Sequence, residues 1–174
     1  DTTFTLSESV AGTIVDGKSD SDPSSSLVGW WKMDGNLNDS IGNSNGTFYI
    51  GSGGSELYFE NFKGEPDNAI QFLNNNSQYA RIPNPSADLT GNLTLSLWIY
   101  RYDTGADDGL ISKDDTKEFE LRIDSSKLCF LHGTDDSSGT DTFVYYGPNN
   151  SIFQADKWHH IVVTRSGSGT SWTI

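Results

Sequence analysis

The segment "LTLSLWIY" (93–100) alternates aliphatic residues with polar or aromatic ones without interruption. Successive side chains of an extended strand point to opposite faces of a sheet, so this order separates two sets of residues. The segment therefore predicts a strand with one face in a core and the other outside it. The core set is Leu93, Leu95, Leu97 and Ile99, and the opposite set is Thr94, Ser96, Trp98 and Tyr100.

Short apolar or aromatic segments of the same kind recur along the chain, separated by clusters of Gly, Asn, Asp and Ser. This spacing predicts an all-β sandwich or barrel. The segment "FELRIDSSKLCFLH" (119–132) predicts a hairpin. The segment "KWHHIVVTR" (157–165) predicts a strand buried on both faces. Its neighbours His159 and His160 would face opposite ways, so we expect two separate hydrogen-bonded structural histidines and no shared metal.

Charge and cysteine content limit the classes of partner. The chain has 174 residues and a formal net charge of −13, which argues against nucleic acid and anionic membrane surfaces. No apolar run is long enough for a membrane span, so we expect no membrane insertion. The single cysteine, Cys129, cannot form an internal disulfide, and no Cys/His set for zinc is present.

The first 26 residues differ from the rest. Residues 1–17 contain a strand-like pattern, and residues 18–26, "KSDSDPSSS", have the small polar composition of a linker. This change of composition predicts a boundary after residue 26. It divides the chain into an N-terminal arm with a linker, 1–26, and a domain, 27–174.

The order of motifs in that domain is specific. The chain resembles the laminin-G-like, concanavalin-A-like jelly-roll family over about residues 27–174, and residues 1–26 lie outside the resemblance. The resemblance implies a two-sheet antiparallel jelly-roll sandwich in a secreted or surface protein. It rests on "LVGWWKMDGNLNDSIGNSNGT" (27–47), "AIQFLNNNSQYARIP" (69–83), "LTGNLTLSLWIY" (89–100), "FELRIDSSKLCFLHG" (119–133) and "DKWHHIVVTR" (156–165).

Jelly rolls of this family continue after the "HIVVT" strand, so we expect the C-terminal strands to be missing from this chain. The gap in the sheet would be filled by the rest of a longer protein, by another chain, or by the N-terminal strand of this chain. We expect a longer protein for the domain, and strand exchange with neighbouring subunits for the N-terminal arm.

The loop "NLNDSIGNSNGT" (36–47) is rich in side-chain oxygens, which are the ligands that calcium prefers. Members of the resembled family often hold a structural calcium ion near this loop. The ligands would be Asp39, as the principal one, with Asn36, Asn43 and Asn45. The alternative is a tight loop of Asx turns without metal, and the sequence leaves both open.

No set of catalytic residues is recognisable, and we expect no enzyme activity. Jelly-roll glucanases of the resembled family carry acid and base carboxylates on one strand. Here Glu118 and Glu120 share a face, but no third carboxylate follows.

The leading function is therefore a non-catalytic extracellular module of a cell-surface, filament or virion-surface protein, acting in adhesion or assembly. The alternative is a carbohydrate-binding module of a secreted glycan-degrading enzyme. Either module would be secreted or attached to a surface.

Exposed aromatic residues are the expected ligand contacts, because sugars stack on rings that have polar groups beside them. The partners would be glycans or other protein subunits. Trp98 is a weaker candidate, because packing against the opposite sheet is the expected role of its ring. The candidates are Tyr100, Tyr102, Tyr145 and Tyr146.

Overall fold

The computed structural model describes the chain in segments that form strands and turns, and these segments hold no helix. The predicted all-β class is confirmed. In this part of the chain no helix is long and apolar enough to cross a membrane. The described residues are 3–12, 27–51, 54–73, 77–83, 92–102, 107–113, 119–124, 127–132, 142–147, 153–166 and 172–173.

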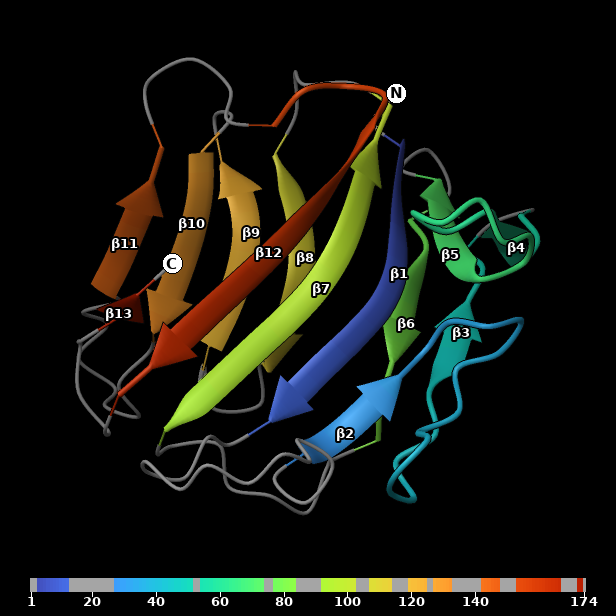
Figure 1. Cartoon of the computed structure of the whole chain (residues 1–174), viewed down its shortest axis with the longest axis horizontal. Helices are drawn as coiled ribbons and strands as arrows, with labels where there is room; N and C mark the ends of the chain where they lie inside the picture. The colour runs from blue at the N-terminus through green and yellow to red at the C-terminus, as the bar shows by residue number, and fades with distance from the viewer. Residues whose placement is uncertain are drawn as a thin grey trace.

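The strands in chain order are β1 (Thr3–Gly12), β2 (Leu27–Trp31), β3 (Thr47–Tyr49), β4 (Leu57–Phe59), β5 (Ala69–Leu73), β6 (Tyr79–Arg81), β7 (Leu93–Arg101), β8 (Asp108–Lys113), β9 (Phe119–Asp124), β10 (Lys127–His132), β11 (Thr142–Tyr146), β12 (Lys157–Arg165) and β13 (Trp172–Thr173). Figure 1 shows them with these labels.

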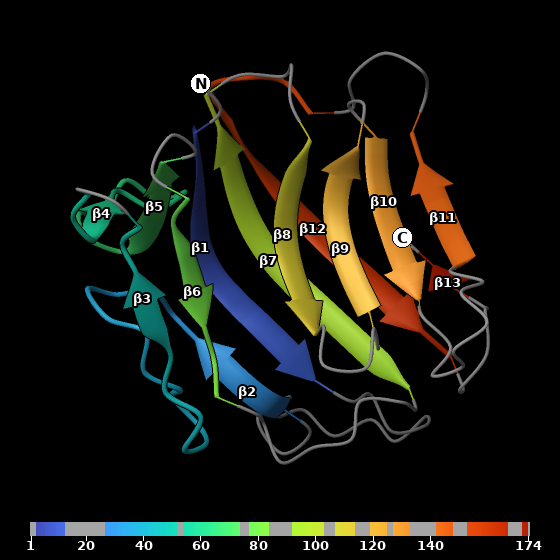
Figure 2. The same cartoon turned by 180° about the vertical axis from the view of Figure 1, so that it is seen from behind.

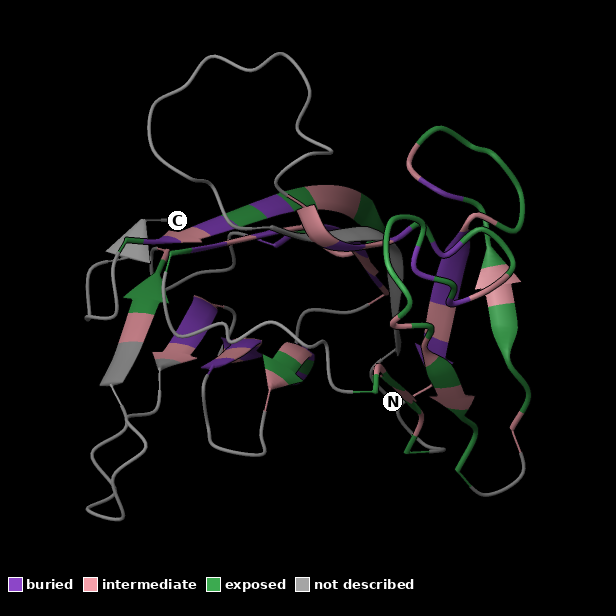
Figure 3. Cartoon of the chain, turned by 90° about the horizontal axis from the view of Figure 1, so that it is seen from below, coloured by how far each residue is buried: buried purple, intermediate pink, exposed green. Residues whose placement is uncertain are grey.

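Two antiparallel sheets face each other. The large sheet has the order β13-β12-β7-β1-β5-β4, with β2 also paired to β1. The small sheet has the order β11-β10-β9-β8 and lies in front of the large one in Figure 2. Figure 3 shows the two layers from the edge. A separate pair, β3 and β6, completes the fold, and the predicted two-sheet antiparallel sandwich is confirmed. The predicted hairpin is also present, as β9 paired with β10.

The N-terminal strand lies inside the large sheet. One edge of β1 pairs with β7, and the other edge pairs with β5 at residues 3–6 and with β2 at residues 9–12. Sequence analysis placed this segment in an arm outside the jelly roll and left open which strand fills the sheet. In the structure β1 of the same chain pairs with β7, whose N–H and C=O groups would otherwise be unpaired along that edge. The pattern of one strand does not reveal its neighbour.

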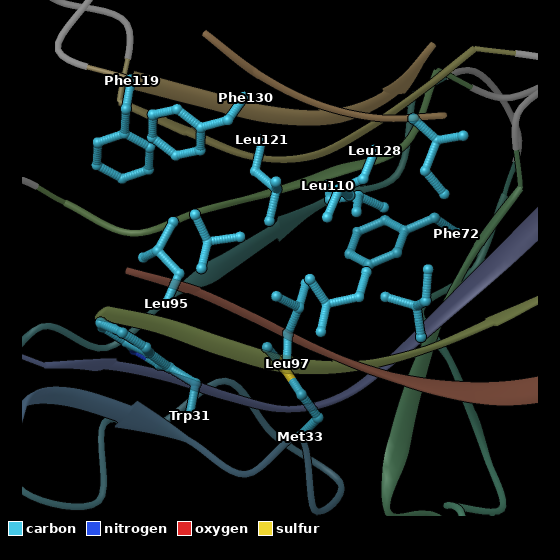
Figure 4. Close-up of a cluster of buried hydrophobic side chains, with 14 of the residues drawn as sticks. Trp31, Met33, Phe72, Leu95, Leu97, Leu110, Phe119, Leu121, Leu128 and Phe130 are labelled. Atoms are coloured by element: carbon cyan, nitrogen blue, oxygen red, sulfur yellow. The ribbon is translucent and has the colours of Figure 1, made fainter. Parts of the chain in front are cut away.

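The core lies between the two sheets. β7 buries every second residue, as its alternation predicted, and contributes Leu95 and Leu97 from the large sheet. Leu121 and Phe130 approach from β9 and β10 of the small sheet (Figure 4). Cys129 is buried and free, in agreement with the absence of a disulfide partner.

The prediction that β12 is buried on both faces is wrong. Ile161 and Val163 are buried in the core, but Val162 on the other face is 40% exposed. His160, which shares this outer face of β12 with Val162, is exposed as well, so the outer face of the strand is not buried. Both histidines do make hydrogen bonds, as predicted: a ring nitrogen of His159 with Gln154 O (3.0 Å), and one of His160 with Ser96 Oγ (2.9 Å).

Candidate functional site

Asp39, the principal predicted calcium ligand, is buried at the centre of its loop. Its Oδ1 accepts hydrogen bonds from the backbone N–H groups of Trp30 (3.0 Å) and Ile41 (3.2 Å). Its Oδ2 accepts one from Ser44 N–H (3.4 Å). Gly42 lies so close that a Cβ there would overlap the Asp39 carboxylate. The carboxylate therefore joins the end of β2 to the loop that follows it.

These hydrogen bonds stabilise the ionised form of Asp39. Burial by itself would raise the pKa of this carboxyl, but the N–H groups of Trp30, Ile41, Gly42 and Ser44 together hold the pKa below its usual value of 3.8. The loop thus supplies a set of backbone donors around one negative charge.

Two other predicted ligands also accept backbone hydrogen bonds. Asn45 Oδ1 accepts from Asp39 N–H (3.0 Å), and Asn36 Oδ1 accepts from Asn38 N–H (2.8 Å). Asn43 is exposed. The loop joins Asp39 and Asn45 directly, and the oxygens of Asp39, Asn45 and Asn36 all point toward backbone N–H groups. As placed, these oxygens fit the alternative of Asx turns better than a calcium shell, which needs six to eight free oxygens.

Within the described residues, no group of three or more His, Cys, Asp or Glu side chains is placed to hold a metal ion. The calcium site therefore stays a prediction, which chelation can test.

A second feature is a row of rings on the outer face of the large sheet, the face toward the viewer in Figure 1. This face is opposite to the core because its β7 residues alternate with the buried leucines. We call it the outer aromatic face. Its members are Phe59, Phe62, Trp98, Tyr100, Tyr102, Trp158 and His160.

Four of these rings meet edge to face. Tyr100 contacts Tyr102, with ring centroids 5.0 Å apart and planes at 63°, and contacts Trp158 at 5.5 Å and 64°. Phe59 contacts Tyr102 at 6.3 Å and 75° and is 39% exposed. The hydroxyl of Tyr102 accepts a hydrogen bond from Gln71 Nε2 (3.0 Å). Partly exposed rings and fixed polar groups therefore lie side by side.

Trp98 has a different environment. Its indole stacks on Phe62 (4.1 Å, 8°) and on the imidazole of His160 (4.8 Å, 20°). The expected packing of Trp98 against the opposite sheet is therefore wrong. The ring lies on the outer face of its own sheet. Because Phe62 and His160 stack on the indole, part of the Trp98 ring face is already occupied within the protein.

The loop that carries Phe62 is fixed by Asn61, a buried polar residue. The Asn61 side chain accepts from the N–H groups of Lys63 (2.9 Å) and Glu65 (3.1 Å) and donates to the Glu65 carboxylate (2.7 Å). These bonds hold a tight turn, which places Phe62 over Trp98.

The Tyr100 hydroxyl lies in an acidic environment. Burial raises its pKa, and the nearby carboxylates of Asp156 and Glu60 and the phenol of Tyr102 raise it further. Tyr100 is therefore a neutral phenol at physiological pH.

The other two predicted contact residues lie in the small sheet. Tyr145 and Tyr146 are 51% and 53% exposed on β11. They are neighbours in the strand, so their side chains point to opposite faces. The Tyr145 hydroxyl donates to Asp124 Oδ2 (3.1 Å). The structure thus brings Tyr100 and Tyr102 together and does not join them with Tyr145 and Tyr146.

Sequence analysis missed three members of the outer aromatic face: Phe59, Phe62 and Trp158. The sequence contained a signal for Trp158, because it lies four residues before the exposed Val162 and so shares its face of the strand. Phe59 and Phe62 lie on this face because of where β4 and the turn after it pack, and no local sequence pattern predicts that position.

A further exposed pair of rings, Tyr49 and Tyr79, stacks across β3 and β6, with centroids 4.6 Å apart and planes at 8°.

Of the two carboxylates considered for catalysis, Glu118 lies outside the described residues. Glu120 lies 4.0 Å from Arg122 Nη1, and Arg122 also pairs with Asp124 (3.1 Å).

Comparison with known proteins gives one match. Residues 74–174, more than half of the chain, match the sequence profile of the concanavalin A-like lectin/glucanases superfamily, in its laminin G type. No curated protein and no solved structure matches the chain. The matched region includes β6 to β13, which contribute all four strands of the small sheet and three of the seven strands of the large one. With its two facing antiparallel sheets and this match, the chain belongs to the concanavalin A-like lectin/glucanases superfamily.

Proposed function

We propose that this chain is a non-catalytic extracellular module that acts in adhesion by holding a glycan against its outer aromatic face. Membership of the superfamily indicates a module that binds carbohydrate or protein. Laminin G-like domains are typically extracellular, which supports the proposed location.

The observation that carries the proposal is the contact of Tyr100 with Tyr102 and Trp158, three partly exposed rings on the outer face of the large sheet. Sugar rings present C–H groups that stack on aromatic rings, and their hydroxyls need donors and acceptors at the margin. The Gln71 amide and the Tyr102 hydroxyl supply such groups, and they are already oriented by their mutual hydrogen bond.

The same face would serve a carbohydrate-binding module attached to a hydrolase, because such a module also needs rings and no catalytic group. Glu120 supports the non-catalytic assignment, because it lies beside Arg122 in the small sheet and not on the outer aromatic face. The role in assembly by strand exchange stays a prediction.

A glycan array, read with and without calcium, tests the proposal. We expect selective binding by the wild-type protein and at least about a tenfold loss of affinity in Tyr102→Ala, as for a central contact residue. Tyr79→Ala is the matched control, since Tyr79 is an exposed tyrosine in the separate β3–β6 pair. Equal, weak signals on all glycans would reject the proposal and favour a protein ligand.

A further inference from the structure

The outer aromatic face is acidic at one end. Asp156 N–H donates to Arg101 O (2.7 Å), which holds the turn before β12 against the end of β7. In the register of β12 with β7, Lys157 is opposite Arg101 and Trp158 is opposite Tyr100, so Asp156 lies at the Tyr100 end of the face. Burial raises the pKa of the Tyr100 hydroxyl, and the negative charges of Asp156 and Glu60 raise it further. Both carboxylates belong to exposed residues.

A lysine lies at the other end of the face. Lys63 Nζ sits over the Phe62 ring, 5.2 Å from its centroid, and Phe62 stacks on Trp98. Trp98 and Tyr100 are two residues apart in β7, a separation of about 7 Å along a strand. Tyr100 therefore lies at the end of the face that is nearer to Asp156 and farther from Lys63.

Rings beside a carboxylate are a recognition chemistry for ammonium groups. The face of an aromatic ring attracts a cation, and a carboxylate adds a charge-assisted hydrogen bond. The rings of Tyr100, Tyr102 and Trp158 and the carboxylate of Asp156 supply both parts. The net charge of −13 attracts a cationic polymer to the molecule and repels a sulfated or uronic one.

We propose that the glycan carries protonated amino groups, as in oligomers of glucosamine, and that one ammonium group binds between the Asp156 carboxylate and a ring of the Tyr100 end. This inference rests on the proposed function and specifies its ligand class. A lysine side chain of a peptide presents the same ammonium chemistry, so a lysine peptide is included in the test.

The test compares glucosamine oligomers with the same oligomers after N-acetylation, in a calorimetric titration at a pH where the amine is protonated. Acetylation keeps the sugar backbone and removes the charge. We expect the amino form to bind about three- to fivefold more tightly, the size of an exposed ion pair. Added salt should reduce this preference, because it screens exposed charges.

Asp156→Asn is the informative variant. Asp156 has a positive φ of 57°, which asparagine also adopts readily, so the turn should be preserved. We expect Asp156→Asn to lose the preference for the amino form while its affinity for the acetylated form is unchanged. Asp34→Asn is the control: it removes one exposed carboxylate from the 34–46 loop and keeps an acceptor oxygen for Asn36 Nδ2.

Each outcome decides between the two proposals. Equal affinity for both forms, or an equal loss of both in Asp156→Asn, overturns the ammonium site and leaves the glycan module standing. Binding of neither form, with selective binding of the lysine peptide at the same residues, overturns the glycan ligand itself. Loss of the preference in Asp34→Asn as well would assign it to net charge and overturn the site at Asp156.

Discussion

Arg101 and Asp108 form a buried ion pair that links the two sheets. Nε and Nη2 of Arg101 contact Oδ2 of Asp108 at 2.8 and 2.7 Å, and the two side chains are 1% and 5% exposed. Arg101 ends β7 in the large sheet, and Asp108 begins β8 in the small sheet. The pair therefore closes the sandwich at one end of the core, where the aliphatic residues of β7 stop.

Removing one partner of this pair should be costly. Asp108→Leu leaves the guanidinium of Arg101 buried without this carboxylate, and we expect the free energy of unfolding to fall by about 3–5 kcal/mol. The double variant Arg101→Met/Asp108→Leu should recover much of the loss, because it removes both desolvated charges. Urea unfolding of the wild type, the single variants and the double variant measures this. A double variant as unstable as the sum of the single ones would contradict the coupling.

Asp39 should make stability depend on pH. Its folded pKa lies below the unfolded value of 3.8, so the ionised carboxylate stabilises the fold fully above that pH. This stabilisation is lost as the pH falls below 3.8 and through the lower folded pKa. We expect Asp39→Asn to cost about 1–3 kcal/mol at neutral pH, as for hydrogen bonds to a charged group, and progressively less in acid. A difference from wild type that does not vary with pH in chemical unfolding would be incompatible with this role.

Chelation separates the two interpretations of the same loop. If backbone N–H groups alone occupy the Asp39 carboxylate, a chelator should leave the melting temperature unchanged. If calcium binds there, chelation should lower the melting temperature in the wild type and have no effect in Asp39→Ala. At calcium concentrations 100 times the dissociation constant, the ion would contribute about 2.7 kcal/mol. Differential scanning calorimetry in calcium and in chelator gives the answer.

Gly29 should tolerate no side chain. A Cβ on Gly29 would overlap the indole of Trp31, which is buried and donates from Nε1 to Ser44 O (2.9 Å). We expect Gly29→Ala to cost about 1–3 kcal/mol, the usual cost of overfilling a packed site. Gly109→Ala is the matched control in a strand, because nothing lies within 4 Å of its Cβ position. Similar denaturation midpoints for the two variants would refute this explanation of Gly29.

The sequence by itself determined the fold class and the inner face of the central strand. The alternation from Leu93 to Ile99 fixes which residues of β7 are buried, because side chains in a strand must alternate between two faces. The same rule places the side chains of His159 and His160 on opposite faces of the sheet. The sequence also indicated a polar loop around Asp39 in which Asx turns were one of two alternatives, because Asn and Asp side chains bind backbone groups that are close in sequence.

Only the tertiary structure decided which strands are neighbours and which faces stay open. The place of β1 between β7 and β5, the exposed face of β12, and the arrival of Phe59 and Phe62 beside Tyr102 and Trp98 all depend on contacts between segments far apart in the chain. A local pattern states that a strand has an apolar face, but not what covers the other one. What covers the other face depends on which strands pair by backbone hydrogen bonds across the whole sheet, and these pairs join residues that are distant in sequence.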